Sequence, residues 1–415
     1  MDELVRRIAV TLGLLLAVRF GGQIPIPGID ITVWNAVYAQ SHSGAIAAAN
    51  ATSGGAIARL SIFALGLVPY MSAAVLIQVA SVVFSGLQDL PRRGESGRRR
   101  IVMLTLVVTL LLATLQSIGI ATALNQIDRL VTNPGALFVF TATLTFTAGS
   151  LVLAWLAEQI TRYGIGNGIV MILFVGLAVE ALHAAAGTYG LNNLGALSSG
   201  VSLAIAGLVV ALVFAIAAVE RAQVLLPLRF AERKLGDRMF AAQDAVLRLK
   251  LNNAGLLPAI VAPWFFYLPL SLAAFFVGAQ TPWLRTLIGQ MQVGQPGHMI
   301  FNTVAILILT YVYTASVVDP DHCAERLKRY GGTVAGVAPG EPTADYIDRA
   351  VSRTTGYGAV YLALVYLIPE LLVAYMGLPF FLGGASALVV VGTVIDLDTQ
   401  VRGLISNNKL GAELT

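Results

Sequence analysis

The chain has 415 residues, of which 57% are hydrophobic and 12% are charged, and its formal net charge is +4. Soluble proteins have about 45–50% apolar and about 25% charged residues, so this composition disfavours a soluble enzyme, a disordered scaffold and a nucleic-acid-binding protein. The single cysteine, Cys323, excludes an internal disulfide framework. With a mean hydropathy of +0.79, the chain is predicted to have lipid as its main solvent.

Apolar runs long enough to cross a bilayer follow one another along the whole chain. A helix of about 20 apolar residues spans a bilayer core of about 30 Å. About ten such runs occur, near residues 5–22, 60–84, 101–122, 136–157, 166–186, 201–219, 254–275, 298–318, 354–372 and 381–401. The first run has a basic flank like a signal peptide, but Arg19 and IPIPGID follow it in place of small residues, so we expect a retained span. The sequence predicts an all-α polytopic membrane protein.

The basic residues between these runs predict the orientation. Of the 26 lysines and arginines, 22 fall at the termini and in the loops of one side, whereas Arg129 and Arg285 lie in the opposite loops. Loops rich in lysine and arginine stay in the cytoplasm, so both termini are expected there. The two longest cytoplasmic loops, near 220–252 and 319–353, carry much of this charge. They are either simple linkers or a docking surface for a cytosolic partner.

The segment near residues 35–59 differs from the spans. Its residues are small and mildly apolar, and glycines interrupt them. The segment is therefore not hydrophobic enough to span a bilayer, but it is too apolar to be comfortable in water. Irregular backbone at membrane depth is tolerated where protein or a water-filled cavity surrounds it. We expect either a short re-entrant element inside a pore or a floppy outer loop.

Patterns of catalysis are missing from the sequence. The four histidines have no ligand-like spacing, and GIGNG (164–168) lacks the spacing of a dinucleotide loop, so it is interpreted as a tight turn into the fifth span. An ion-coupled transporter usually keeps charged groups at mid-membrane, whereas the carboxylates here lie near span ends: Glu158, Glu180, Glu370, Asp396 and Asp398. A secondary transporter of small solutes built on inverted repeats remains the alternative, and an intramembrane protease is a weaker one.

Ten stretches of the chain resemble the SecY family, the channel subunits of the bacterial protein-secretion translocon. They are IPIPGID (24–30), SGGAIARLSIFALGLVPYMSAAVLIQ (53–78), GESGRRR (94–100), QSIGIAT (116–122), EQITRYGIGNGI (158–169), VERAQ (219–223), LKLNNAGLLPAI (249–260), PGEPTADYID (339–348), YLIPE (366–370) and FLGGASALVVV (381–391). The stretches occur in the order of the family and cover nearly the whole chain.

The resemblance implies about ten transmembrane helices in two inverted five-helix halves, which form a clamshell with a central pore and a lateral gate. The N-terminal half would cover residues 1–186, with a re-entrant plug near 50–65, and the C-terminal half residues 187–415. Such a channel is not an enzyme. It would pass unfolded secretory proteins across the membrane and release transmembrane segments sideways into lipid.

The resemblance also assigns residues to the pore and to the lateral gate. By motif position, the pore ring would consist of Leu67, Met71, Ile169, Leu173, Ile260 and Val389. Gln78 and Asn252 match polar positions at the gate. A collar of aliphatic side chains can dewet and so block ions, and it offers no polar group that would hold a passing chain.

The implied partners are SecE and SecG in the membrane, and SecA or the ribosome on the cytoplasmic side of a bacterial inner membrane. Signal peptides, nascent chains and lipid would contact the channel, whereas no cofactor, metal or DNA is expected. The cytosolic partners would dock on basic residues: Arg229, Arg233, Lys234, Arg238, Arg326, Lys328 and Arg329.

The chain departs from the family pattern in two of its cytoplasmic stretches. Ala338 stands where an arginine usually precedes PGE, and Val224 and Leu225 stand where an arginine pair usually follows ERxQ. Charge-assisted hydrogen bonds are lost at these positions. We therefore expect weakened coupling to SecA, as in a divergent or accessory member of the family.

Overall fold

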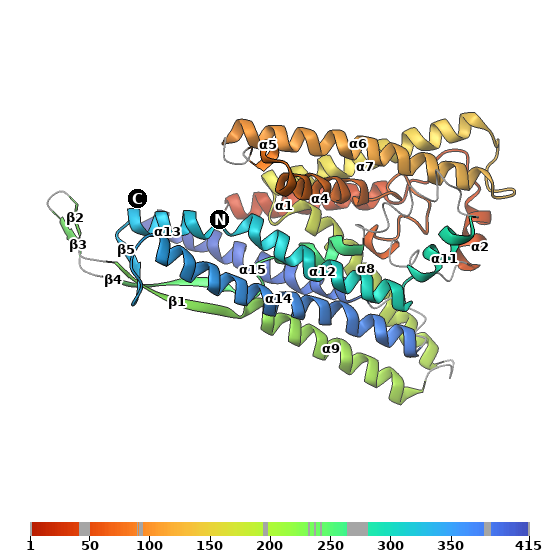
Figure 1. The fold of residues 1–415 in the computed structure, drawn as a ribbon. Coiled ribbons are helices and arrows are strands. Elements are labelled where there is room, and N and C mark those ends of the chain that lie inside the picture. The colour runs from red at the N-terminus through yellow and green to blue at the C-terminus, as the bar shows by residue number, and fades with distance from the viewer. Residues whose placement is uncertain are drawn as a thin grey trace.

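The computed structural model describes residues 2–40, 50–88, 90, 94–193, 198–230, 233–235, 238–240, 243–263, 281–376 and 383–413. Long helices lie side by side, and a small sheet projects from one end of them (Figure 1). Both ends of the chain lie at the end of the bundle from which the sheet projects. The helical fold class predicted from the sequence is confirmed, and the predicted seventh span beyond residue 263 lies outside the described residues.

The first part of the chain forms helices that match the early apolar runs. They are α1 (Asp2–Gly21), α2 (Ile31–Gln40), α4 (Val68–Val83), α5 (Ser85–Gln88), α6 (Glu95–Asn125), α7 (Ala136–Tyr163) and α8 (Gly168–Asn193). The helix α7 ends at Gly164, whose backbone is extended. As α8 begins, the side-chain oxygen of Asn167 accepts a hydrogen bond of 3.0 Å from the Ile169 N–H. GIGNG is therefore the tight turn that the sequence predicts.

The second part of the chain adds a matching set of long helices. They are α9 (Ser199–Arg221), α11 (Pro282–Gln290), α12 (Pro296–Val317), α13 (Pro320–Arg329), α14 (Glu341–Met376) and α15 (Gly384–Glu413). Local chemistry fixes where these helices begin. The Ser198 hydroxyl accepts a hydrogen bond from the Val201 N–H, the Asp319 carboxylate caps α13 in the same way, and proline occupies the first turn of α11, α12 and α13.

The two long charged loops contain strands that the sequence analysis did not predict. A sheet of strand order β4-β1-β5 joins β1 (Gln223–Phe230), β4 (Gln243–Lys250) and β5 (Gly332–Val334), all antiparallel. A second pair joins β2 (Arg233–Leu235) and β3 (Arg238–Phe240). Alternate residues of β1, Leu226 and Leu228, are buried. This period of two is the strand signal, and the density of charge and Pro227 obscured it.

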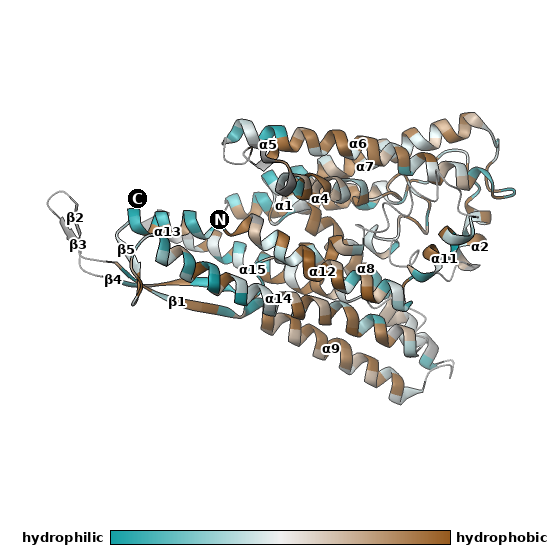
Figure 2. Ribbon diagram, in the orientation of Figure 1, coloured by the Kyte–Doolittle hydropathy of each residue, from teal (hydrophilic) through white to brown (hydrophobic). Residues whose placement is uncertain are grey.

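Six described helical runs are long and apolar enough to cross a membrane: Glu95–Asn125, Ala136–Tyr163, Gly168–Gly190, Ser199–Arg221, Pro296–Arg329 and Glu341–Leu372. The helices α1, α4 and α15 lie over three further predicted spans, and residues 257–263 begin another. Hydrophobic residues dominate the middle of the bundle, whereas hydrophilic residues gather near the end that carries the sheet (Figure 2). This distribution fits a protein that crosses a bilayer several times.

The predicted second span begins later than expected. The apolar run was taken to start near residue 60, but the chain makes turns up to Leu67 and α4 begins at Val68. Gly66 has a positive φ of 62°, which ends any regular structure before Pro69 in the first turn of α4. The turns that precede α4 therefore continue directly into that helix.

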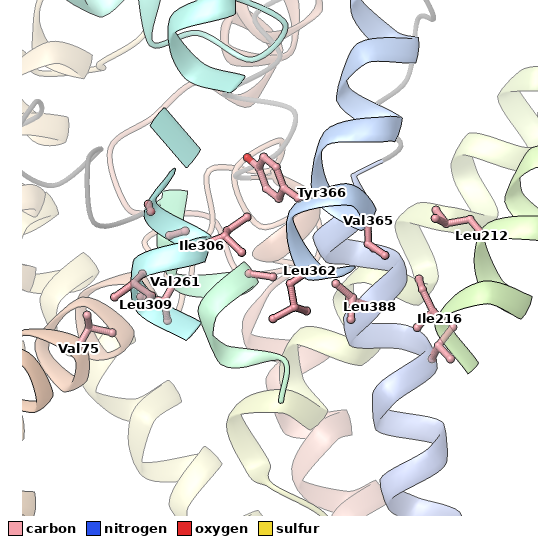
Figure 3. Close-up of a cluster of buried hydrophobic side chains, with 14 residues drawn as sticks. Val75, Leu212, Ile216, Val261, Ile306, Leu309, Leu362, Val365, Tyr366 and Leu388 are labelled. Atoms are coloured by element: carbon pink, nitrogen blue, oxygen red, sulfur yellow. The ribbon is translucent and has the colours of Figure 1, made fainter. Parts of the chain in front are cut away.

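The largest buried cluster joins the second part of the chain to α4. Figure 3 shows Val75 of α4 at one side of side chains from α9, α12, α14, α15 and the segment 257–263. Leu362, Leu388, Ile306 and Ile216 are fully buried in this cluster. Apolar packing thus continues across the line where the two parts of the chain meet.

Candidate functional site

The six residues predicted for the pore ring converge from distant parts of the sequence. Four of them are buried in one apolar cluster, with exposed fractions of 7% or less: Met71, Leu173, Ile260 and Val389. Ile169 packs against this cluster, and Leu67 is buried in the adjoining one, which Ile169 also contacts. We call the six residues the waist. They come from α4, α8, α15 and the helical segment 257–263, together with Leu67 just before α4.

The re-entrant segment, residues 50–65, lies against the waist. Ala51 is 2% exposed and belongs to the same cluster as Met71 and Leu173. Beside it, Gly54 and Gly176 of α8 are so close that a Cβ on Gly176 would lie 3.0 Å from the Cα of Gly54. The backbone of this segment thus packs directly on α8.

Internal hydrogen bonds hold the re-entrant segment in shape. The Asn50 side-chain oxygen accepts from the Ala58 N–H at 2.8 Å, and the Asn50 carbonyl oxygen accepts from the Gly55 N–H at 2.8 Å. The indole nitrogen of Trp34 donates to the carbonyl oxygens of Ile57 and Ala58 at 3.1 and 3.0 Å. The segment is therefore a folded element and not a floppy loop.

A seam runs between α4 and α12, and Gln78 lies on it. The side chain of Gln78 forms a hydrogen bond with Tyr313 of α12. Around this bond, apolar side chains line a small pocket between α4, α12 and the segment 257–263: Val75, Val79, Leu257, Pro258, Val261, Leu309 and Val312. The lining of the seam around this bond is thus mostly apolar.

Asn252, the second predicted gate residue, has different partners. Its side-chain nitrogen donates to Glu220 at the end of α9 (2.8 Å) and to the Gly255 carbonyl oxygen (3.0 Å). Tyr361 of α14 also donates to Glu220, at 3.4 Å. These contacts place Asn252 in a polar cluster that joins α9, α14 and the chain before residue 257.

The predicted docking residues gather at the end of the bundle that carries the sheet. Arg326, Lys328 and Arg329 occupy the last turn of α13, and β5 follows that helix and pairs with β1. Arg229 of β1 lies 3.3 Å from Asp244 in an exposed ion pair. The other three, Arg233, Lys234 and Arg238, belong to β2 and β3, and their side chains lie outside the described part of the structure.

Two of the partners at this site were not predicted. Tyr313 lies outside the stretches that resemble the family, and Glu220 falls in VERAQ (219–223) without an assigned role. Each becomes recognisable only when the fold places a residue far along the chain beside it. Among the described residues, no group of three or more His, Cys, Asp or Glu side chains gathers where a metal ion could be held. The site is therefore an apolar waist, a folded segment beside it and a seam.

Known proteins share both the sequence and the fold of this chain. The SecY family profile matches residues 61–397. The chain is 41% identical to the protein translocase subunit SecY of Escherichia coli (strain K12), over 100% of this chain and 94% of that protein. The chain belongs to the SecY family.

Further SecY-family relatives and solved structures agree with this assignment. The SecY translocase subunit of Vibrio cholerae serotype O1 is 38% identical over 97% of this chain and 92% of its own length. A structure described as a protein conducting channel superposes with a TM-score of 0.67 at 17% identity, covering 97% of this chain and 93% of that one. Sec61 in a canine ribosome–channel complex gives 0.64 at 16% identity, with the same coverage. These two structures establish the fold.

Proposed function

We propose that this chain is the channel subunit of a protein translocon, which passes unfolded secretory proteins across the plasma membrane. The observation that carries the proposal is the waist. Aliphatic side chains from both parts of the chain meet there, and Ala51 of the re-entrant segment packs against them. A polypeptide channel needs such an adaptable apolar constriction, because it must block ions at rest and close around many different sequences.

The chemistry of the waist suits a passive channel. The six residues carry no hydrogen-bonding group that would retain an extended chain, and the unbranched side chain of Met71 can adapt to different shapes. Residues 50–65 would act as a plug beneath the waist and move aside during passage. The force would come from ATP hydrolysis by SecA or from elongation by the ribosome.

The seam would serve as the lateral gate. Parting α4 from α12 exposes the apolar pocket around Gln78 and Tyr313. Hydrogen bonds between helices in a membrane are worth about 1 kcal/mol, so an apolar signal helix could offset the loss of this one by its own packing. Apolar segments would then leave sideways into lipid, and polar chain would continue through the waist.

The two halves would move about the connection between α8 and α9. The predicted boundary between residues 186 and 187 falls inside α8, which continues to Asn193. SecE and SecG would be the membrane partners. SecA or the ribosome would dock on the sheet and α13, on the cytoplasmic side of a bacterial inner membrane. Both termini of the chain would lie on that same side.

Crosslinking tests the path of the polypeptide. In a Cys323→Ser background, single cysteines replace Met71 and Ile260, and a secretory precursor with one cysteine is stalled in the channel. Disulfide adducts should form at both positions, because both side chains would surround the chain. The control is Leu130→Cys, which is equally buried but belongs to another cluster. A solute transporter would give no adduct at either waist position, and that result would contradict the proposal.

A further inference from the structure

Two arginines converge on one backbone oxygen of the re-entrant segment. Arg19, near the end of α1, donates from Nη1 to the Gly54 carbonyl oxygen at 2.8 Å. Arg59 donates from Nη2 to the same oxygen at 3.0 Å. Arg59 also donates from Nε to the carbonyl oxygen of Gly22 at 3.1 Å, just beyond α1. One carbonyl oxygen of the segment thus joins two side chains that are 40 positions apart in the sequence.

The glycines of the segment make this convergence possible. Gly54 and Gly55 have positive φ values of 65° and 83°, a conformation that side chains disfavour. A Cβ at Gly54 would lie 3.1 Å from Gly176 Cα and 3.3 Å from Nη1 of Arg19. The turn therefore presents a bare backbone oxygen to both guanidinium groups while it packs on α8.

The Gly54 carbonyl oxygen is an uncharged acceptor for two cations. Within the described part of the chain, neither guanidinium forms a salt bridge with a carboxylate. Hydrogen bonds from a charged donor are stronger than those between neutral groups, and two of them end on this atom. An acceptor without a negative charge still releases its donors more readily than a buried carboxylate would. Two such bonds cross between the segment and the end of α1, from Arg19 to Gly54 and from Arg59 to Gly22. They are strong enough to hold the segment, and because neither acceptor is charged they can also break.

We propose that Arg19 and Arg59 form a latch that holds residues 50–65 against the waist in the resting channel. The proposal rests on the function proposed above and adds to it the residues that set how easily the seal opens. When the segment leaves, Arg19 loses the Gly54 carbonyl oxygen, and Arg59, which belongs to the segment, loses the carbonyl oxygen of Gly22. The bond from Arg59 to Gly54 lies within the segment and moves with it. The latch thus lowers the fraction of time that the idle channel is open.

The fraction of time that the idle channel is open can be measured by alkylation of a buried cysteine. In a Cys323→Ser background, Ala51→Cys places a thiol on the segment at a position that is 2% exposed. A water-soluble maleimide should react slowly with it in the otherwise unchanged channel. Arg19→Gln or Arg59→Gln should raise the rate about ten- to hundredfold, the range expected for the loss of a hydrogen bond from a charged donor. Arg59→Lys keeps the charge but loses the planar, forked set of N–H donors, so its reporter rate should lie between those of the unchanged channel and of Arg59→Gln.

Matched controls separate unlatching from general loosening. Arg285→Gln removes an exposed arginine of α11 and should leave the reporter rate unchanged. A second reporter, Ala359→Cys, is buried in α14, in the second part of the chain, and should stay protected in every variant. Equal gains at Ala51→Cys and Ala359→Cys would show general loosening and would overturn the latch.

Ion leakage gives an independent readout of the same latch. Proteoliposomes that contain the Arg19→Gln or Arg59→Gln variant should leak halide ions faster than those with the unchanged channel or with Arg285→Gln. Unchanged leakage together with an unchanged reporter rate would overturn the proposal. Crosslinking of a stalled precursor to Met71→Cys in the same membranes keeps the two hypotheses apart. Failure of that adduct contradicts the channel function, whereas failure of the latch leaves the adduct intact.

Discussion

A buried polar pair ties two long helices together at the scale of single residues. His298, in the first turn of α12, hydrogen-bonds through Nδ1 to Oε1 of Glu370 on α14, and both side chains are nearly inaccessible to solvent. The Gly294 N–H donates to the same oxygen at 3.1 Å. His298 lacks ligand-like spacing, and Glu370, which ends the stretch YLIPE (366–370), is recognisable from the sequence only as a carboxylate near a span end. Their contact depends on how α12 packs on α14.

Removing one member of this pair should cost more than removing both. His298→Leu leaves the carboxylate of Glu370 buried without its strongest partner, and we expect a loss of about 3 kcal/mol in the free energy of unfolding. The double variant His298→Leu with Glu370→Met should recover most of that loss. Urea unfolding of the purified protein in detergent checks both values. Additive losses in the double variant would show that the two side chains act independently.

Close backbone contact sets the packing at the scale of helices. In each part of the chain, the last long helix begins with a glycine that lies against the helix before it. A Cβ on Gly168 of α8 would overlap the carbonyl oxygen of Ala157 on α7, and one on Gly384 of α15 would overlap that of Val365 on α14. Small residues let membrane helices approach closely. The same device in both parts agrees with the predicted repeat of two halves.

Alanine at either of these glycines should therefore destabilise the protein. Gly168→Ala and Gly384→Ala push two helices apart, and we expect each to lose about 1–3 kcal/mol and to lower the apparent melting temperature in detergent. The control is Gly207→Ala in α9, where nothing lies within 4 Å of the added atom. That variant should be neutral or slightly stabilising, because alanine favours helix over glycine. Equal melting temperatures for the three variants would refute the role of close contact.

At the scale of the whole molecule, the features that could be predicted are those that a pattern along the sequence encodes. Apolar runs gave the long helices, and family motifs placed the six waist residues, which the structure brings together although they are spread from Leu67 to Val389. The sheet at the end of the bundle was missed, because the charge of the loop around Arg229 and Arg248 outweighed the alternation in β1. Contacts such as that of Arg19 with Gly54 depend on the folded geometry, so the spacing of residues along the sequence does not predict them.

At the scale of the whole molecule, the two parts of the chain share the apolar cluster of the waist and meet at the seam. The fold positions the waist between α4 and α8 of the first part and α15 and residues 257–263 of the second. A constriction divided between two bodies can widen when they move apart, whereas a site built within one rigid bundle cannot. We therefore expect the waist to be closed at rest and to open around a polypeptide.

Conductance across a planar bilayer shows whether the waist is closed at rest. With the purified channel and its membrane partners in the bilayer, we predict no ionic current at rest and discrete openings once a signal peptide is added. Replacing Ile260 of the waist by asparagine should produce current without the peptide, because a polar collar holds water. A steady solute flux that saturates and is indifferent to signal peptide would contradict the account.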